Sequence, residues 1–200
     1  MNEYSFKEMV IVAQNNRNKI KKAAVEVISR KGFFNTRMQD IADEAGLAVG
    51  TIYNYFSSKD EVLSYIFENE MKRRMKYISE LKKENLTIKE FLNKFLTKHF
   101  SLLVKNPHLG RVLVREKDFS RGEKSGEIKE HMNSMINMLE KIFEIGVKRE
   151  EIKNINTHLM AVYFFASMQG IIEYSLTEPE MELLEAAPNF ILERIEDIFI

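Results

Sequence analysis

Apolar residues recur at intervals of three and four along almost the whole chain, and no segment shows the strict alternation that a half-buried strand requires. One face of the first clear example carries Ile20, Ala23, Ala24, Val27 and Ile28. Three prolines and eight glycines among 200 residues leave few interruptions, so long helices are favoured over many short strands. The sequence therefore predicts an all-α protein.

Capping signals give the expected helix boundaries. Thr36–Gln39, Ser58–Glu61 and Thr87–Glu90 have the form of a capping box, and Gly32 and Gly46 stand where C-terminal caps belong. After the first helix, which ends at Gly32, the expected helices span residues 37–45, 49–55, 59–83, 88–106, 108–118, 126–148, 157–175 and 182–199. The polar segment from Ser120 to Ser125 is expected to be a flexible loop. Pro188 predicts that the last helix kinks there or begins late.

Composition excludes several classes of protein. The absence of cysteine rules out disulfides, thiolate metal sites and cysteine nucleophiles, and it suits a cytoplasmic location. The four histidines show no metal-ligand spacing, and there is no glycine-rich phosphate loop, so we expect neither an enzyme nor a cofactor. Charged residues interrupt the N-terminus where a signal peptide would be apolar. The most apolar run, Leu159–Met168, is about half the roughly 20 residues that span a bilayer, so we expect a buried helix and no membrane association.

Charge is unevenly distributed although its sum is zero. Residues 1–76 contain 13 Lys and Arg against 10 Asp and Glu, whereas residues 77–200 contain 17 against 20. Residues 17–31 carry six basic side chains and a single acidic one, Glu26. Such a patch can meet DNA phosphates, although a solvated helix face would give the same pattern.

Residues 37–56 form a helix-turn-helix candidate, because two short helices flank a tight turn that contains glycine. An ordinary helical hairpin in a bundle is the alternative. The second helix favours DNA binding, because it carries Thr51, Tyr53 and Asn54, whose polar groups find partners among phosphates and base edges. Gly50 costs about 1 kcal/mol of helix propensity relative to alanine, and close approach to DNA would explain it.

The region from Ile20 to about Leu63 resembles the TetR family of bacterial transcriptional regulators. The matching positions are a basic first helix followed by Lys31-Gly32-Phe33, Thr36, Asp40-Ile41-Ala42, Ala45-Gly46-Leu47, Gly50-Thr51-Ile52-Tyr53-Asn54-Tyr55-Phe56 and Ser58-Lys59-Asp60-Glu61. The resemblance implies about nine helices and a homodimer. It implies a DNA-binding domain over residues 1–62 and a ligand-binding and dimerisation domain over residues 63–200. The implied function is that of a repressor, which binds a pseudo-palindromic operator as a dimer and is released by a small, largely hydrophobic effector.

The resemblance also implies which residues meet DNA. The expected contacts are Arg37, Gln39, Val49, Gly50, Thr51, Tyr53, Asn54 and, on a phosphate, Lys59. Two positions depart from the family pattern, since Ala48 stands where a capping serine is frequent and Val49 where a lysine is common. Tyr53 could bind a phosphate or cap the core of the small domain. Packing roles are expected for Ile41, Ala42, Ile52 and Phe56.

Behind residue 76 the apolar side chains are unusually rich in methionine and phenylalanine. Such side chains form either an ordinary core or an adaptable pocket for a flexible apolar ligand. Two segments resemble the acyl-CoA-responsive repressors of fatty-acid degradation within the family: residues 98–103, Lys-His-Phe-Ser-Leu-Leu, and the sequence around residues 50–63. Long-chain acyl-CoA is therefore the expected effector. The candidate ligand-binding residues are Phe100, Leu103, Met135, Phe164 and Met168, with Arg111 and Arg115 for an anionic headgroup.

The helix at residues 159–172 is apolar on nearly all sides and must be buried all round, which is easiest if residues 157–199 pack against a second subunit. Two alternatives remain at this point. An architectural DNA-binding protein would keep the helix-turn-helix but would not need a body of about 120 residues. An activator of the same family would share every feature above.

Overall fold

The computed structural model describes residues 3–116, 125–177 and 181–200, and within these ranges it is built from helices. The elements are α1 (Glu3–Lys31), α2 (Met38–Ala45), α3 (Val49–Tyr53), α4 (Lys59–Leu81), α5 (Ile88–Lys105), α6 (Pro107–Arg115), α7 (Ser125–Lys148), α8 (Thr157–Thr177), α9 (Met181–Arg194) and a short 3₁₀ helix, η1 (Glu196–Ile198). The all-α prediction is therefore confirmed. The loop expected at Ser120–Ser125 falls outside the described residues, apart from Ser125 at the start of α7.

Of the three predicted capping boxes, the one at Thr87 forms in full and the one at Ser58 in half, because the Glu61 carboxylate accepts the backbone N–H of Ser57 instead of that of Ser58. The Ser58 hydroxyl accepts a hydrogen bond from the Glu61 backbone N–H at 3.2 Å, and Thr87 and Glu90 bond each other reciprocally. At α2 the prediction was wrong by one residue. Asp40, not Gln39, accepts the backbone N–H of Arg37 at 2.8 Å. The Thr36 hydroxyl donates instead to the carbonyl of Gly32, because the end of α1 leaves that carbonyl free.

The last helix ends at Arg194 rather than at residue 199. Ile200 N donates to Glu151 O at 3.2 Å, and Lys153 N donates to Ile198 O at 2.8 Å, so the chain end pairs with the segment between α7 and α8. Those backbone groups are then unavailable to a helix. Pro188 lies within α9 and is buried.

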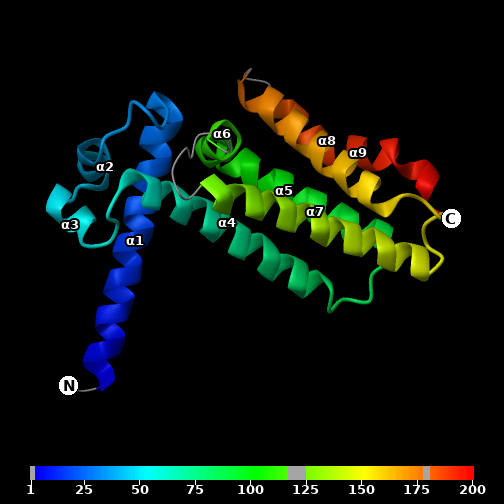
Figure 1. The fold of residues 1–200 in the computed structure, drawn as a ribbon, viewed down its shortest axis with the longest axis horizontal. Coiled ribbons are helices and arrows are strands. Elements are labelled where there is room, and N and C mark those ends of the chain that lie inside the picture. The colour runs from blue at the N-terminus through cyan, green and yellow to red at the C-terminus, as the bar shows by residue number, and fades with distance from the viewer. Residues whose placement is uncertain (1–2, 117–124, 178–180) are drawn as a thin grey trace.

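Two hydrophobic cores share α4. Val62, Leu63 and Ile66 at its start belong to the core of α1, α2 and α3, whereas Ile78 and Leu81 belong to the core of the body. The packing roles predicted for Ile41, Ala42, Ile52 and Phe56 are confirmed, because all four are buried in the first core. Figure 1 shows α1, α2 and α3 gathered at one end, with α4 leading from them along the body.

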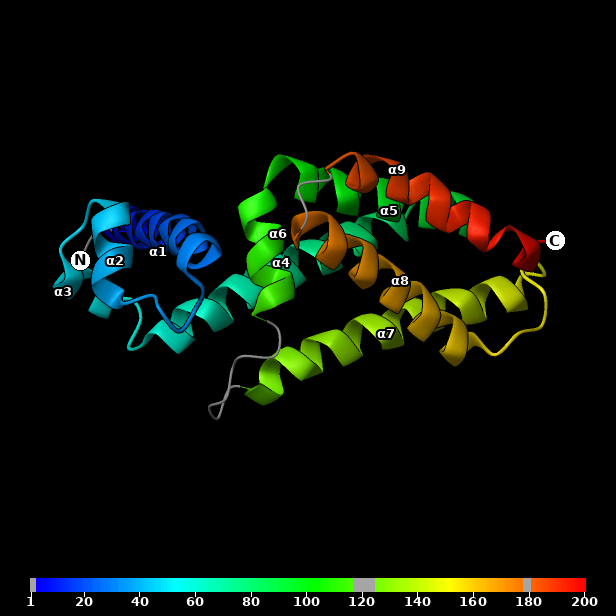
Figure 2. The same cartoon turned by 90° about the horizontal axis from the view of Figure 1, so that it is seen from above.

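In the body, α5, α7, α8 and α9 run lengthwise, and α6 crosses at the end that faces the small domain (Figure 2). One face of α8 packs on the core through Phe164, Met168 and Ile172. The opposite face is exposed within a single chain, where Leu159 is 64% exposed and Tyr163 and Tyr174 are about half exposed. By length and composition Thr157–Leu176 could also cross a membrane, but its buried face is typical of a core helix of a folded domain.

Candidate DNA-binding and effector-binding sites

The helix-turn-helix is built around a left-handed residue. Gly46 has φ 58°, a conformation that glycine adopts without strain, and it ends α2 as predicted. The N–H groups of Gly46 and Leu47 donate back to Asp43 O and Ala42 O. The chain then turns directly into α3, which Ile52 anchors with no exposed surface. Ala48 supplies no side-chain cap, so packing holds this short helix in place.

The outer surface of α3 presents the residues that the sequence predicted to face DNA. Tyr53 is 53% exposed, and Gly50 and Asn54 are also exposed, whereas Thr51 and Val49 are half-buried. Val49 packs at the edge of the small core. Because the residue is more than half exposed and is not among those packed on that core, Tyr53 does not cap it. A Cβ added at Gly50 would meet nothing within 4 Å, so the fold itself does not require glycine there.

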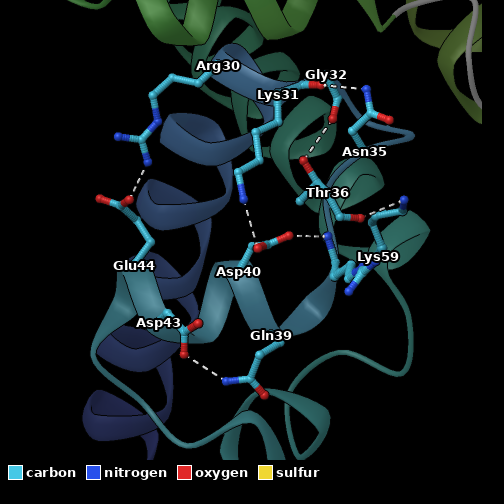
Figure 3. Close-up of polar contacts among 11 residues, drawn as sticks. Arg30, Lys31, Gly32, Asn35, Thr36, Gln39, Asp40, Asp43, Glu44 and Lys59 are labelled. Atoms are coloured by element: carbon cyan, nitrogen blue, oxygen red, sulfur yellow. Dashed lines mark hydrogen bonds and ion pairs between the residues drawn. The ribbon is translucent and has the colours of Figure 1, made fainter.

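Ion pairs fasten α2 to α1 beneath this surface (Figure 3). Arg30 pairs with Glu44, and Lys31 bonds Asp40 at 2.8 Å. The hydrogen bond from Lys31 lowers the pKa of Asp40, with the Arg37 backbone N–H adding to the effect. Gln39, a predicted DNA contact, donates to Asp43 at 2.7 Å.

The basic run at residues 17–31 therefore has a largely internal role. Besides Arg30 and Lys31, Lys21 lies 3.7 Å from Glu70. Arg17 donates to Tyr55 O and lies over the rings of Phe56 and Tyr65. Most of the basic side chains in this run therefore contact residues of the protein itself and stabilise the packing of α1 on α2 and α4.

Lys59, the predicted phosphate ligand, is also occupied in the free protein. Its ammonium donates to Phe33 O at 2.7 Å, to Thr36 O at 2.8 Å and to Phe34 O at 3.3 Å, and it lies 4.5 Å from the centre of the Phe33 ring. A lysine has three donors, and all three are engaged here. A DNA phosphate would compete with these carbonyls for the ammonium of Lys59. Nothing in the sequence indicated that Lys59 bonds the segment between α1 and α2.

A largely apolar cavity lies inside the body. Helices α4 to α8 all contribute to its wall, which consists of Phe67, Met71, Arg74, Phe95, His99, Leu103, Gly110, Leu113, Val114, Met132, Met135, Phe165, Met168, Gln169 and Ile172. The cavity leaves about 70 Å³ for the centres of water-sized molecules, where one water needs about 10–15 Å³. The cavity is therefore small in this conformation, and its four methionines are the side chains best able to move aside.

Of the predicted ligand-binding residues, the structure brings Leu103, Met135 and Met168 to the cavity wall. Phe100 and Phe164 are fully buried in the neighbouring core and do not line it. The two predicted headgroup arginines lie elsewhere as well. Arg111 donates to Leu176 O at 3.3 Å, and Arg115 is exposed at the end of α6.

The prediction missed the three polar residues of the wall, Arg74, His99 and Gln169. Burial lowers the pKa of His99 well below 6.5, and the positive charges of Arg74 and Arg73 lower it further, so the imidazole is neutral at pH 7. Its ring stacks on Phe95 with centroids 5.9 Å apart. His99 lies within residues 98–103, the segment whose resemblance suggested the effector. That resemblance was the signal that could have identified His99 as a residue of the site.

Helix α6 touches both the cavity and the DNA-binding domain. Gly110, Leu113 and Val114 line the cavity, whereas Val112 belongs to the small core. At the start of α6, His108 Nδ1 lies 2.8 Å from Ser29 Oγ of α1. The helix therefore lines the cavity on one side and packs against the core of the DNA-binding domain on the other.

Comparison with known proteins agrees with this architecture. A family model described as bacterial regulatory proteins, tetR family, matches residues 20–66. A second, described as YsiA-like protein, C-terminal region, matches residues 67–191. The fatty acid metabolism regulator protein of Bacillus subtilis is 33% identical over 172 residues, which make up 86% of this chain and 89% of that protein.

Solved structures give the same result. FadR from Bacillus subtilis in complex with stearoyl-CoA has a TM-score of 0.81 and 32% identity, covering 88% of this chain and 95% of that one. FadR from Bacillus halodurans has a TM-score of 0.80 and 25% identity, covering 88% and 94%. This chain belongs to the TetR family of bacterial regulatory proteins, which are DNA-binding transcriptional regulators and not enzymes.

Proposed function

We propose that this protein is a repressor that binds its operator as a homodimer and is released by a long-chain acyl-CoA. The observation that carries the proposal is the cavity, whose wall is apolar except at Arg74, His99 and Gln169 and shares α6 with the DNA-binding domain. An amphipathic ligand with a long apolar chain fits such a lining. The similar FadR of Bacillus subtilis was solved with stearoyl-CoA, which supports this choice of ligand. As a regulator of chromosomal DNA it would act in the cytoplasm.

The exposed apolar face of α8 and α9 supports the homodimer. Between these helices lies a groove lined by Gly170, Ile171, Tyr174, Leu183, Ala186, Ala187 and Phe190. Phe190 is 53% exposed and Tyr174 54%, which is costly for large apolar side chains unless a partner covers them. A second copy packed about a twofold axis would bury the same patch on both subunits and present two recognition helices to successive major grooves.

DNA contact is proposed for the outer surface of α2 and α3. Thr51, Tyr53 and Asn54 would approach base edges and phosphates, and Gly50 would let the backbone come close. Val49 is half-buried, so it offers a small apolar surface, suited to a thymine methyl. Arg37 and Gln39 at the start of α2 would contact the DNA backbone.

Release follows from the size of the cavity. Pockets for drug-sized ligands span about 300–1,000 Å³, so a long acyl chain must push the walls apart. Movement of α6 or α4 would change the position of the small domain, because both helices contribute to its core. A ligand that binds one dimer shape more tightly by about 1–3 kcal/mol would weaken DNA binding about 5- to 150-fold.

The test is titration of the operator complex with stearoyl-CoA, stearate and coenzyme A, followed by fluorescence anisotropy. We expect release by stearoyl-CoA at concentrations where coenzyme A alone has no effect. Tighter operator binding in the presence of stearoyl-CoA would indicate an activator or a co-repressed regulator. Binding of stearoyl-CoA to the protein with no change in operator affinity would overturn the proposed release mechanism.

A further inference from the structure

A cationic cleft adjoins the apolar cavity on the side of α4 and α5. We call it the α4–α5 cleft, and it is lined by Arg73, Arg74, Lys76, Tyr77, Glu80, Phe95, Lys98, His99 and Leu102. Four of these side chains are cations at neutral pH and one, Glu80, is an anion. The α4–α5 cleft leaves about 400 Å³ for the centres of water-sized molecules, far more than the 70 Å³ of the inner cavity.

The cleft and the cavity are adjacent. Arg74, Phe95 and His99 line both, so a passage from the open polar cleft to the apolar interior would run between these three residues. Because His99 is neutral, it does not add a further charge at this passage. A ligand that occupied both spaces would place an apolar chain inside and a polar, anionic group outside.

Several cations of the cleft are available to an anion. Arg73 pairs with Glu70, and Lys98 lies 5.9 Å from the centre of the Tyr77 ring. Within the described part of the chain, Arg74, Lys76 and Lys98 have no carboxylate within ion-pairing distance. The cations that line the cleft outnumber its one lining carboxylate, Glu80, so a multiply charged anion is the favoured occupant.

We propose that the α4–α5 cleft binds the phosphate groups of a coenzyme A thioester whose acyl chain enters the adjoining cavity. This inference rests on the proposed function and adds to it a basis for selectivity. A free fatty acid offers one carboxylate at the passage, whereas coenzyme A carries several phosphate charges that reach the outer cations. The protein therefore prefers the thioester to the free acid.

The experiment removes the outer charges and leaves the passage intact. Lys76 and Lys98 are exposed on their helices, so the double variant Lys76→Gln/Lys98→Gln retains the fold. The matched control is Lys83→Gln/Lys105→Gln, which removes two exposed charges near the ends of the same two helices, outside the cleft. Binding of stearoyl-CoA and of stearate to each full-length protein is measured by calorimetry at two salt concentrations.

We expect the cleft variant to bind stearoyl-CoA about tenfold more weakly, with a smaller salt dependence, and to bind stearate as the wild type does. The control variant should match the wild type with both ligands. Equal losses for stearate and stearoyl-CoA, or no loss for stearoyl-CoA, would overturn the cleft as the phosphate site while leaving acyl-CoA as the effector. Failure of the wild-type protein to bind stearoyl-CoA would overturn both proposals.

Discussion

The carboxylate of Glu116 accepts a hydrogen bond at 3.1 Å from the backbone N–H of Phe33, a residue 83 positions earlier in the chain. Both residues are buried. Burial raises the pKa of Glu116, while the Phe33 N–H and the charges of Arg115 and Lys59 lower it. This contact joins the end of α6, which lines the cavity, to the connection between α1 and α2. It links the helix that lines the cavity to the DNA-binding domain.

Loss of this acceptor should destabilise the protein. Glu116→Ala leaves the buried Phe33 N–H unpaired, at a cost of about 1–3 kcal/mol, whereas Glu116→Gln keeps an acceptor oxygen and should cost much less. Urea denaturation of both variants measures the difference. Equal stabilities of the Ala and Gln variants would mean that the hydrogen bond contributes little.

Gly50→Ala separates folding from DNA binding. A methyl group there meets open space, and alanine favours helix by about 1 kcal/mol over glycine, so stability should stay equal or rise. Operator affinity should fall, because the methyl occupies the surface proposed to meet DNA. Gly46→Ala is the control, and it should destabilise the protein because φ at that residue is 58°. Thermal melting measures the change in stability, and fluorescence anisotropy measures the change in operator affinity. Unchanged operator affinity for Gly50→Ala would mean that residue 50 does not lie in the DNA interface.

Lys59→Ala is expected to act first on stability. It removes three hydrogen bonds from a charged donor, each worth about 1.5–3 kcal/mol at most in proteins, so the small domain should lose a few kcal/mol. The salt dependence of DNA binding tests the second role, since loss of a phosphate contact lowers its slope by about one. A stable variant with a reduced slope would assign Lys59 to phosphate binding alone.

His99 should make stability depend on pH. Its pKa in the folded protein lies well below the value of about 6.5 expected in the unfolded chain, so between these two values the unfolded chain binds more protons. Stability is therefore fully present above pH 6.5 and falls as the pH drops toward the folded pKa. His99→Phe should flatten this dependence between pH 7.5 and 5.5, as followed by urea denaturation. A slope that survives the substitution would have to come from other groups.

Phe190→Glu should disrupt the proposed dimer. A carboxylate in the α8–α9 groove would be buried without a partner, which a two-copy interface does not tolerate. Met75→Glu is the control, because Met75 is also an exposed apolar side chain but lies on α4 away from the groove. Light scattering after size exclusion should find Phe190→Glu monomeric and weakly bound to operator, and Met75→Glu dimeric. A dimeric Phe190→Glu protein would place the interface elsewhere.

Local sequence signals were sufficient for much of the architecture. Helical spacing predicted the all-α fold, and the glycine caps at Gly32 and Gly46 ended α1 and α2 as expected, because these features depend on residues close in the chain. The same holds for Ile52 on α3 and for Phe56 just after it, since both were expected to face inward from residues close in the chain. The family and the class of function followed from a continuous run of residues, 20–63.

The tertiary structure decided what faces the cavity. Helical periodicity shows that Phe100 and Met135 lie on buried faces, but it does not show which of those faces borders the cavity. In the structure Phe100 packs in the core, whereas Met135 lines the cavity. Arg74 and His99 come together from α4 and α5, and Glu116 reaches Phe33 across 83 residues. The sequence determines each helix and its apolar face, because both arise from neighbouring residues. The pairing of those faces, and hence the lining of the cavity and its connection to the DNA-binding domain, is decided by packing between helices far apart in the chain.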